Sequence, residues 1–255
     1  MSPKSSSLKQ NCSQKEWQVR VDLAAAYRLI EHFGMAELIY NHISVRVPGE
    51  NDAFLINPFG LRYDEIKASN LLKINSEAKV LQAKSKKQDL KVNPAGFIIH
   101  SAIHEARPEV NCIVHTHTIA GMSIASLPEG LQLYSQEALR FYDRVGYHDF
   151  QGIVLDAKEK KALLKSLGNK PVLILRNHGL LTLGTSVAQA FCLMYYLERA
   201  CQVQLTLQGK QAKKPSKKVC EKTAEQHWNK VYQLDDLVWP AMIRLLDQKD
   251  SSYKK

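Results

Sequence analysis

The sequence predicts a mixed α/β fold in which a largely antiparallel sheet lies between helices. Stretches with apolar residues at helical spacing alternate with short runs of β-branched and apolar residues. Several strand-like runs follow one another with short links, which favours antiparallel pairing over a doubly wound parallel sheet. With 255 residues, 45% of them hydrophobic, the chain is long and apolar enough to bury a sizeable core.

In the first half, a helix is expected from Glu16 to Phe33, with Gly34 as its stop. Asn93 and Pro94 then predict a helix start, because asparagine caps helices and proline suits the first helical position. This second helix should end near Arg107. Between the two helices we expect four short strands, at residues 43–47, 54–57, 71–74 and 79–82.

The second half continues the alternation. Strands are expected around 112–118, 131–134, 172–175 and 180–183, and helices at 119–126, 157–167 and 186–207. Residues 224–247 resemble one further helix, broken at Pro240. The simplest organisation is a flexible tail (1–15), one domain (16–208) and a basic linker with a helical extension (209–255).

The net charge of +10 comes largely from lysines near the chain ends, and they are densest between Lys210 and Lys222. That segment has Gly, Pro and no apolar periodicity, so we expect a solvated linker that attracts anionic partners. Specific nucleic-acid binding is not expected, because no recognition motif accompanies the charge. No apolar run is long enough to span a bilayer and no signal peptide is evident. Five scattered cysteines fit reduced thiols, so a cytoplasmic protein is expected.

The most informative motif is a pair of histidines one residue apart in Cys112-Ile-Val-His-Thr-His-Thr118. Side chains at i and i+2 leave a strand on the same face, so His115 and His117 should point into one space. A third candidate, His178, ends the next apolar strand in Arg176-Asn-His-Gly179. Three imidazoles with an open fourth position are a typical ligand set of a catalytic divalent metal, most often zinc. The alternative is a set of hydrogen-bonded polar groups on a sheet.

The chain contains several separated motifs in this order: Asn41-His-Ile-Ser44, Leu55-Ile-Asn-Pro-Phe-Gly60, Ala95-Gly-Phe-Ile-Ile-His-Ser-Ala-Ile-His104, Arg107-Pro108, His115-Thr-His117 and Arg176-Asn-His-Gly179. Taken together, these motifs resemble the class II aldolase/adducin family. The resemblance covers about residues 24–208.

The resemblance implies a three-layer α/β/α sandwich around a mainly antiparallel sheet, assembled as a homotetramer. It also implies a Zn²⁺ ion held by His115, His117 and His178, with Fe²⁺ or Mn²⁺ as alternatives, since histidines do not discriminate among these metals. Sugar-phosphate members of the family cleave or epimerise a phosphorylated ketose. Asn41 and Gly60 match substrate-binding positions.

The chain departs from the aldolase pattern at Gly96, where the aldolases carry a glutamate that acts as general base. A base of this kind contributes about 100- to 10,000-fold to a rate. Phe59, Pro94 and Ala95 stand where small hydroxyl residues bind the phosphate of the substrate, which argues against a sugar phosphate. In these departures the chain resembles the adducin-type branch. Gly96 would instead let substrate approach the backbone amides at the helix start.

Glu137 and Tyr134 are the candidate catalytic acid–base groups, because the resemblance places this region near the metal. Glu137 is equally compatible with a surface or helix-capping role. His100 and His104, four residues apart on a helix, share one face and are expected to pack, with one of them orienting a metal ligand.

Three functions follow from these observations. The first is a metal-dependent, aldolase-like lyase acting on a small, non-phosphorylated hydroxy-carbonyl substrate. The second is an adducin-like oligomeric interaction module with a vestigial or structural metal. The third is an Fe-dependent oxygenase or decarboxylase.

Overall fold

The computed structural model describes residues 8–83, 91–150, 157–229 and 234–255. Its centre is an eight-stranded sheet in the order β4-β3-β2-β1-β5-β8-β7-β6, in which only the β6–β7 pair is parallel. The predicted mainly antiparallel sheet between helices is therefore confirmed. The strands are β1 (His42–Arg46), β2 (Phe54–Ile56), β3 (Leu72–Ile74), β4 (Val80–Gln82), β5 (Cys112–Thr116), β6 (Val145–His148), β7 (Val172–Leu175) and β8 (Gly179–Gly184).

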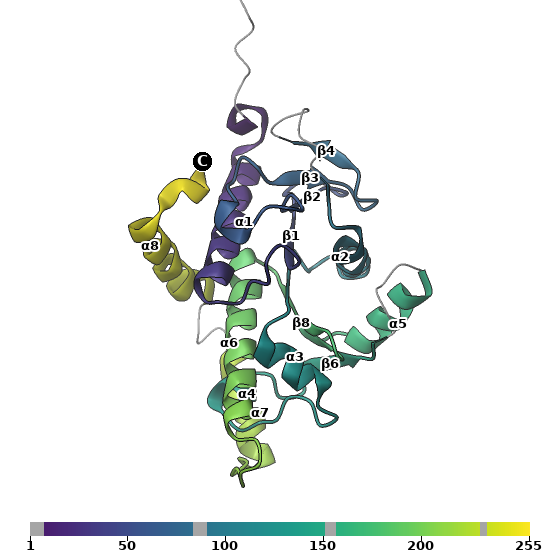
Figure 1. Ribbon diagram of the computed structural model, residues 1–255, viewed down its shortest axis with the longest axis vertical. Coiled ribbons are helices and arrows are strands. Elements are labelled where there is room, and N and C mark those ends of the chain that lie inside the picture. The colour runs from purple at the N-terminus through teal and green to yellow at the C-terminus, as the bar shows by residue number, and fades with distance from the viewer. Residues whose placement is uncertain (1–7, 84–90, 151–156, 230–233) are drawn as a thin grey trace, which may run out of the picture.

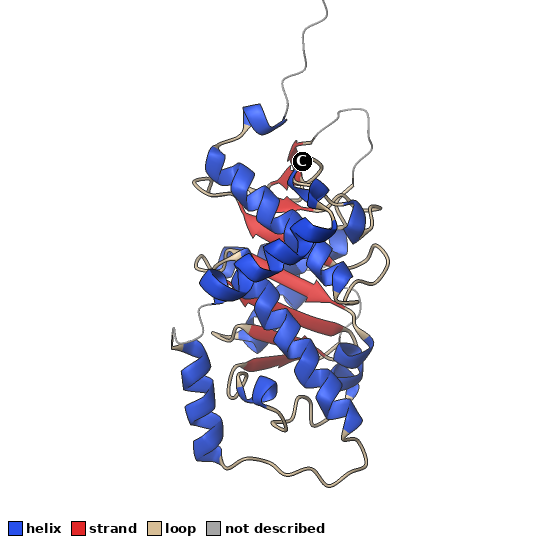
Figure 2. Ribbon diagram, turned by 90° about the vertical axis from the view of Figure 1, so that its left-hand side faces the viewer, coloured by secondary structure: helices blue, strands red, loops and turns tan. Residues whose placement is uncertain are grey.

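Helices cover both faces of the sheet (Figures 1 and 2). One face carries α1 (Gln14–His32), α6 (Val187–Thr206) and α8 (Trp239–Lys249), and the other carries α2 (Pro94–Ala106) and α5 (Ala157–Leu167). The remaining helices are α3 (Ile119–Ser126), α4 (Gln136–Leu139) and α7 (Lys217–Trp228). Single turns lie at Leu8–Asn11, Tyr63–Glu65, Leu234–Val238 and Ser251–Lys254.

The alternation of side chains along the strands separates two cores. In β5, Cys112 and Val114 belong to the core beneath α1 and α6, whereas Ile113 belongs to the core beneath α2 and α5. The same alternation in β1 sends Ile43 and Val45 to the α1 side. His42 and Ser44, the polar residues that alternate with Ile43 and Val45, therefore face α2.

Side-chain caps begin the helices where the sequence predicts a start. The Ser13 hydroxyl accepts a hydrogen bond from the Glu16 amide at the start of α1, and Asn93 Oδ1 accepts one from the Gly96 amide at the start of α2. Pro94 occupies the first turn of α2, where the missing amide hydrogen costs no helical bond.

The expected strand at residues 131–134 is wrong. The backbone amide of Leu131 donates to the Tyr147 hydroxyl at 3.0 Å, and the amide of Gln132 donates to Gln204 Oε1 at 2.7 Å. Side chains thus satisfy the polar groups that a strand would pair. The sequence reading also missed β6, which contains Tyr147.

The break expected at Pro240 within the helical stretch 224–247 is also wrong. The chain forms two helices instead, because α7 ends at Trp228 and α8 begins at Trp239. Pro240 lies in the first turn of α8, a position that tolerates proline, and so it starts a helix rather than breaking one.

The C-terminal segment packs onto the rest of the fold. Trp239, Leu246 and Tyr253 are part of the core beneath α1 and α6, and the Trp239 indole donates to Asp22 of α1. The carbonyl of Tyr253 accepts a hydrogen bond from the Ala68 amide at 2.8 Å. Among the described residues, no helix is long and apolar enough to cross a membrane.

A buried charge cluster joins α1 to the β2–β4 side of the sheet, and it provides a test of this packing. Arg20 is fully buried, pairs with Glu16 at 2.8 Å and donates to the carbonyl of Leu71 at 2.9 Å. Replacing Arg20 with Met should lower the unfolding free energy by about 3 kcal/mol or more, because it leaves buried acceptors unpaired. Urea unfolding would measure the change.

The control is Arg62→Met, which removes an exposed pair with Asp64 and should cost less than about 1 kcal/mol. Equal effects of the two substitutions would contradict the view that Arg20 holds these elements together.

Candidate metal centre

Three imidazoles converge where β5 ends and where the chain turns from β7 into β8. His115 is the fourth residue of β5, His117 follows that strand, and His178 lies in the turn before β8. Antiparallel pairing of β5 with β8 sets Thr116 opposite Leu180 and so brings the turn beside the two strand histidines. These three residues form a cluster whose candidate ligand atoms all lie within 4.8 Å of one another.

The turn that carries His178 depends on its neighbours. Asn177 adopts a left-handed backbone conformation (φ 56°), which asparagine tolerates better than most residues. Gly179 follows, and a side chain there would overlap the carbonyl oxygen of Thr116. Glycine thus allows the turn to approach β5 closely enough for the imidazoles to meet.

The three Nε2 atoms face one another. They are separated by 2.7 Å between His115 and His117, 2.9 Å between His117 and His178, and 3.3 Å between His115 and His178. Ligand atoms about 2.0–2.1 Å from a tetrahedral zinc lie roughly 3.3 Å apart, so these separations are close to those of a coordination shell.

Nδ1 of His115 and Nδ1 of His117 each face a hydrogen-bond acceptor. Nδ1 of His115 faces the Leu180 carbonyl at 2.9 Å, and Nδ1 of His117 faces Glu37 Oε2 at 2.6 Å. Since both partners accept, each Nδ1 carries the proton, and in the neutral ring Nε2 presents a lone pair. Lone pairs pointing at one another repel unless a cation lies between them, and a carboxylate or carbonyl on the outer nitrogen is the usual support of a metal-binding histidine.

The electrostatic environment keeps His115 and His178 neutral. Burial lowers the pKa of His115 well below its usual range, and the neighbouring imidazoles lower it further. Burial, followed by the effect of His117, lowers the pKa of His178 to about 4. Neutral imidazole is the form that binds metal, so the donor set fits a divalent cation.

A chain of hydrogen bonds lies directly behind the cluster, on the α2 side of the sheet. Nδ1 of His42 lies 3.0 Å from Nε2 of His100, and Nδ1 of His100 lies 2.7 Å from the Ser44 hydroxyl. The hydroxyl lies 2.8 Å from Nε2 of His104, whose Nδ1 lies 3.2 Å from the carbonyl oxygen of Val110. We refer to His42, His100, Ser44 and His104 as the histidine chain. His100 and His104 are fully buried, as their predicted packing role requires.

Of the predicted substrate-binding residues, Gly96 lies against His42, whose ring lies 5.0 Å from that of His115. It is in the first turn of α2, and a side chain there would overlap the ring of His42. Asn41 is buried, and its Oδ1 accepts a hydrogen bond from the Glu37 amide at 2.7 Å, which positions the partner of His117. Gly60 has a left-handed φ of 107°, with open space where a side chain would lie.

The predicted acid–base residues lie elsewhere in the chain. Glu137, in α4, acts electrostatically on Tyr196 of α6 and His227 of α7, and the ammonium of Lys214 lies 5.3 Å from the ring of Tyr134. Neither residue contributes to the cluster of candidate ligands found among the described residues. Their catalytic role stays a prediction.

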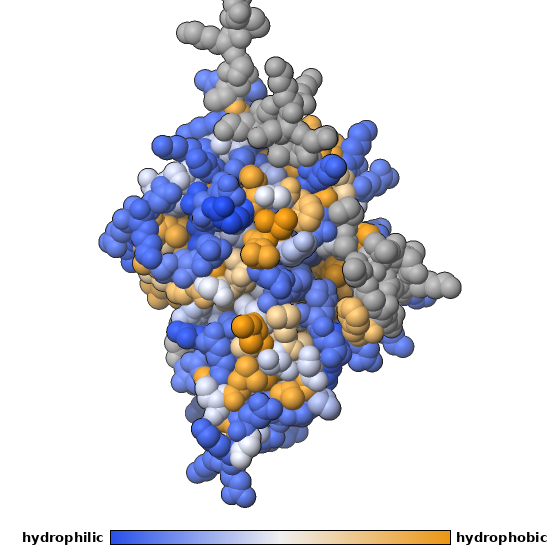
Figure 3. Space-filling model, in the orientation of Figure 1, coloured by the Kyte–Doolittle hydropathy of each residue, from blue (hydrophilic) through white to orange (hydrophobic). Residues whose placement is uncertain are grey.

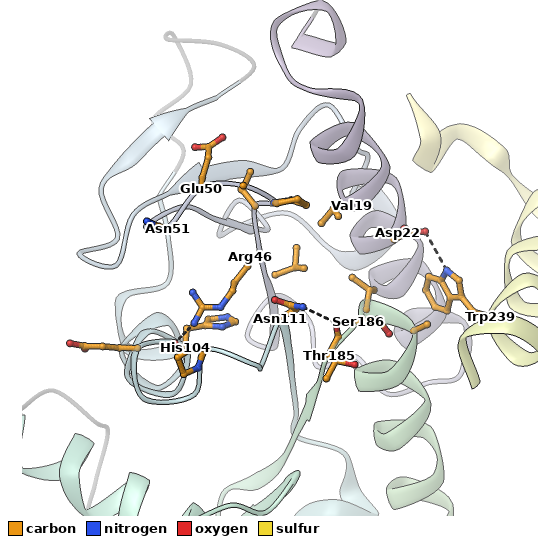
Figure 4. A pocket seen from close by; sticks show the side chains of 18 residues that line it. Val19, Asp22, Arg46, Glu50, Asn51, His104, Asn111, Thr185, Ser186 and Trp239 are labelled. Atoms are coloured by element: carbon orange, nitrogen blue, oxygen red, sulfur yellow. Dashed lines mark hydrogen bonds between the residues drawn. The ribbon is translucent and has the colours of Figure 1, made fainter. Parts of the chain in front are cut away.

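A separate cavity of about 970 Å³ lies at the other end of β1 and β5 (Figure 4). Arg46 and Asn111 line it where β1 ends and β5 is about to begin, whereas His42 and His115 lie at the opposite ends of those strands. His104 also lines it, so the histidine chain runs between the metal cluster and this cavity.

Comparison with known proteins identifies the family. Residues 21–205 match the model of the Class II Aldolase and Adducin N-terminal domain, and the chain belongs to this family. It is 43% identical over 249 residues to a Pseudomonas aeruginosa protein whose name places it provisionally among the class 2 aldolases, covering 95% of this chain and 94% of the relative.

Two further relatives are an adducin and a sugar-phosphate aldolase. Mouse alpha-adducin is 48% identical over 188 residues, which is 73% of this chain but only 25% of the adducin. The structure of L-fuculose 1-phosphate aldolase from Glaciozyma antarctica superposes with a TM-score of 0.83 at 29% identity, covering 100% of this chain and 97% of that one.

Glu37 and His42, to which the sequence assigns no role, lie next to the cluster. Glu37 lies in a segment without a recognisable pattern, and only the fold reveals that it reaches His117. His42 stands in the Asn41-His-Ile-Ser44 motif without an assigned role. The signal was present, because a histidine and a serine two residues apart on a strand share a face with each other.

The buried imidazoles predict acid-sensitive stability. Burial lowers the pKa of His104 to about 3 and that of His100 well below its usual range. Between pH 6.5 and about 3 the unfolded state binds the proton that folded His104 excludes, so acid favours unfolding. In metal-free protein, lowering the pH from 7.5 to 4.5 should reduce the unfolding free energy by about 3 kcal/mol from His104 alone.

Urea unfolding as a function of pH would measure this slope. In the His104→Gln variant, the slope of the unfolding free energy against pH should fall by the equivalent of about one bound proton. His32→Gln, at the exposed end of α1, should change it far less. A stability that does not vary between pH 7.5 and 4.5 would contradict the neutral, buried histidine chain.

Proposed function

We propose that this chain is a metal-dependent, aldolase-like lyase that acts on a small hydroxy-carbonyl substrate without a phosphate group. The convergence of three Nε2 atoms carries the proposal, because the acceptors on Nδ1 of His115 and His117 leave two lone pairs facing each other at 2.7 Å, which is unfavourable without a cation. Membership of the class II aldolase and adducin family supports it.

The proposed ligands are His115, His117 and His178, with Zn²⁺ as the metal. Three imidazoles leave a position for substrate, as catalytic zinc sites do, although the same donors also accept Fe²⁺ or Mn²⁺. When bound, the metal would polarise a substrate carbonyl and stabilise the enediolate that carbon–carbon cleavage leaves. The protein's part is to hold His115 and His178 neutral by burial, while the acceptors on Nδ1 of His115 and His117 orient those two rings so that Nε2 faces the metal position.

The proposed absence of phosphate from the substrate rests on the residues around the site. The family resemblance sets Phe59 where a phosphate site would need polar groups, and the ring of Phe59 lies 6.1 Å from that of Tyr40. Substrate is proposed to bind near Gly96, with Asn41 and Gly60 shaping the loops beside it. Glu137 and Tyr134 remain the proposed acid–base groups, and because they lie outside the cluster of their own chain, this role requires another copy to supply them.

A homotetramer is proposed on the same basis, and exposed apolar residues near the cluster support an interface there. Ile119 is 81% exposed and Leu38 is 74% exposed, and they neighbour the His117 and Glu37 segments. Phe150, also exposed, lies 6.3 Å from the ring of His178. Apolar side chains gather among polar ones on the molecular face drawn in Figure 3. Clusters of this kind mark protein contacts.

The second candidate function is an oligomeric interaction module of the adducin type. The 48% identity to alpha-adducin favours it, and it exceeds the identity to the aldolase-named relative. In this case the metal is structural or vestigial, and the lysine-rich segment contacts an anionic partner. An Fe-dependent oxygenase or decarboxylase uses the same three donors and is distinguished by the identity of the metal.

The decisive measurement is the metal content of the purified protein. Elemental analysis should find about one zinc per chain, because three imidazoles form a typical ligand set for this metal. The double variant His115→Ala/His117→Ala should contain none. His148→Ala, which removes a buried histidine on β6 outside the cluster, should keep the metal.

Protein that contains no metal and takes none up on dialysis would refute the enzyme proposal and leave the interaction module. Iron in place of zinc would favour the oxygenase. His117→Ala separates the functions further, because the interaction module predicts an intact assembly with unchanged partner binding.

The proposed interface can be tested by charge. Ile119→Glu should shift the assembly toward smaller species in light scattering, because a carboxylate buried at an apolar contact costs several kcal/mol. Val219→Glu, at an exposed apolar residue of α7, is the matched control and should leave the assembly unchanged. Equal behaviour of the two variants would remove Ile119 from the interface.

A further inference from the structure

His42 lies beside the candidate metal ligands, but it is neither one of them nor a predicted catalytic residue. It is 4% exposed, and its ring lies 5.0 Å from that of His115, centroid to centroid. The ring fills the space that a side chain at residue 96 would take, so only glycine at the start of α2 admits it. His42 is not part of the ligand cluster itself.

The histidine chain fixes which nitrogen of His42 carries the proton. The last acceptor, the Val110 carbonyl, can only accept, so Nδ1 of His104 donates and Nε2 of a neutral His104 accepts. The Ser44 hydroxyl must then donate to His104 and accept from Nδ1 of His100. Nε2 of His100 is left as an acceptor for Nδ1 of His42.

Every bond in this series has one direction, and its end is a lone pair on Nε2 of His42. This direction of hydrogen bonding requires neutral imidazole rings. Burial favours the neutral form by lowering the pKa of both His100 and His104. Among the described residues, none forms a hydrogen bond with Nε2 of His42, whereas Nδ1 has its partner in His100. Nε2 of His42 therefore keeps a free lone pair that can accept a hydrogen bond from a ligand.

Resting on the metal-dependent function proposed above, we propose that Nε2 of His42 accepts a hydrogen bond from a neutral hydroxyl group of a metal-bound substrate. The chain through Ser44 acts as a positioning device, because it denies Nε2 a proton with which to donate. A carboxylate or phosphate oxygen at the same point would meet a lone pair and be repelled. The substrate class is therefore a hydroxy-carbonyl compound with a free hydroxyl next to the metal-binding oxygens, rather than its phosphate ester.

The proposal is testable before the substrate is known, with two metal-chelating probes that differ by one hydroxyl. Acetohydroxamate and glycolohydroxamate both bind a divalent metal through their hydroxamate oxygens, but only glycolohydroxamate carries a hydroxyl on the adjacent carbon. Calorimetric titration of the zinc-loaded protein should show about 3- to 10-fold tighter binding of glycolohydroxamate, as one buried hydrogen bond provides.

Three variants assign this preference. His42→Phe keeps an aromatic ring but removes the acceptor, and Ser44→Ala interrupts the chain, so both should bind the two probes equally. Ser101→Ala is the matched control, because it removes a buried hydroxyl from α2 that bonds only the Ile98 carbonyl. It should retain the full preference.

A second readout does not depend on any ligand and guards against a variant that folds poorly. Side-chain ¹⁵N spectra of the zinc-loaded protein distinguish protonated from unprotonated imidazole nitrogens. His42, His100 and His104 should all carry the proton on Nδ1 alone. In Ser44→Ala this uniform pattern should be lost at His100 and His42, and in Ser101→Ala it should persist.

The outcomes separate this inference from the function on which it rests. Failure of the protein to bind zinc or acetohydroxamate would refute the proposed metal function. Tight binding of acetohydroxamate with no gain from the added hydroxyl would refute the role of His42 alone. A proton on Nε2 of His42 in the wild-type spectra would do the same.

Discussion

The pairing of β1 with β5 is the constraint on which the site depends. It sets His42 opposite His115 and Ser44 opposite Ile113, so the polar residues of β1 face α2 beside the strand that carries the candidate metal ligand His115. Because side chains alternate along a strand, a shift of one residue would turn these groups toward α1 and the larger core. The register of one strand pair thus determines both the candidate metal centre and the histidine chain behind it.

The polar network between β1 and α2 is an unusual use of buried space. Four polar side chains are enclosed between β1 and α2, and apart from Nε2 of His42 they satisfy their hydrogen bonds within the protein. They do so in series, ending at the carbonyl of Val110. A network of this kind contributes rigidity and a fixed direction of hydrogen bonding rather than net stability. Gly96 completes it, because the space of its missing side chain holds the ring of His42.

The relationship to both aldolases and adducins has a structural basis. The sheet and its covering helices superpose on an aldolase with a TM-score of 0.83, while the sequence is 48% identical to an adducin over the shared domain. The three imidazoles depend on backbone features, namely the β5–β8 pairing and the Asn177-Gly179 turn, that also maintain the fold. The three histidines can therefore persist while residue 96 changes. The fold is compatible with both a catalytic and a scaffolding role.

The sequence by itself determined the fold class, most helices and strands, and the three histidines, because these follow from local periodicity and from the two-residue repeat of a strand. It failed where distant side chains replace local pairing, as Tyr147 and Gln204 do at residues 130–132. Only the tertiary structure brought Glu37 to His117 and joined His42, His100 and His104 into one chain. These contacts link residues about 60 to 80 positions apart, and no local pattern encodes such a distance.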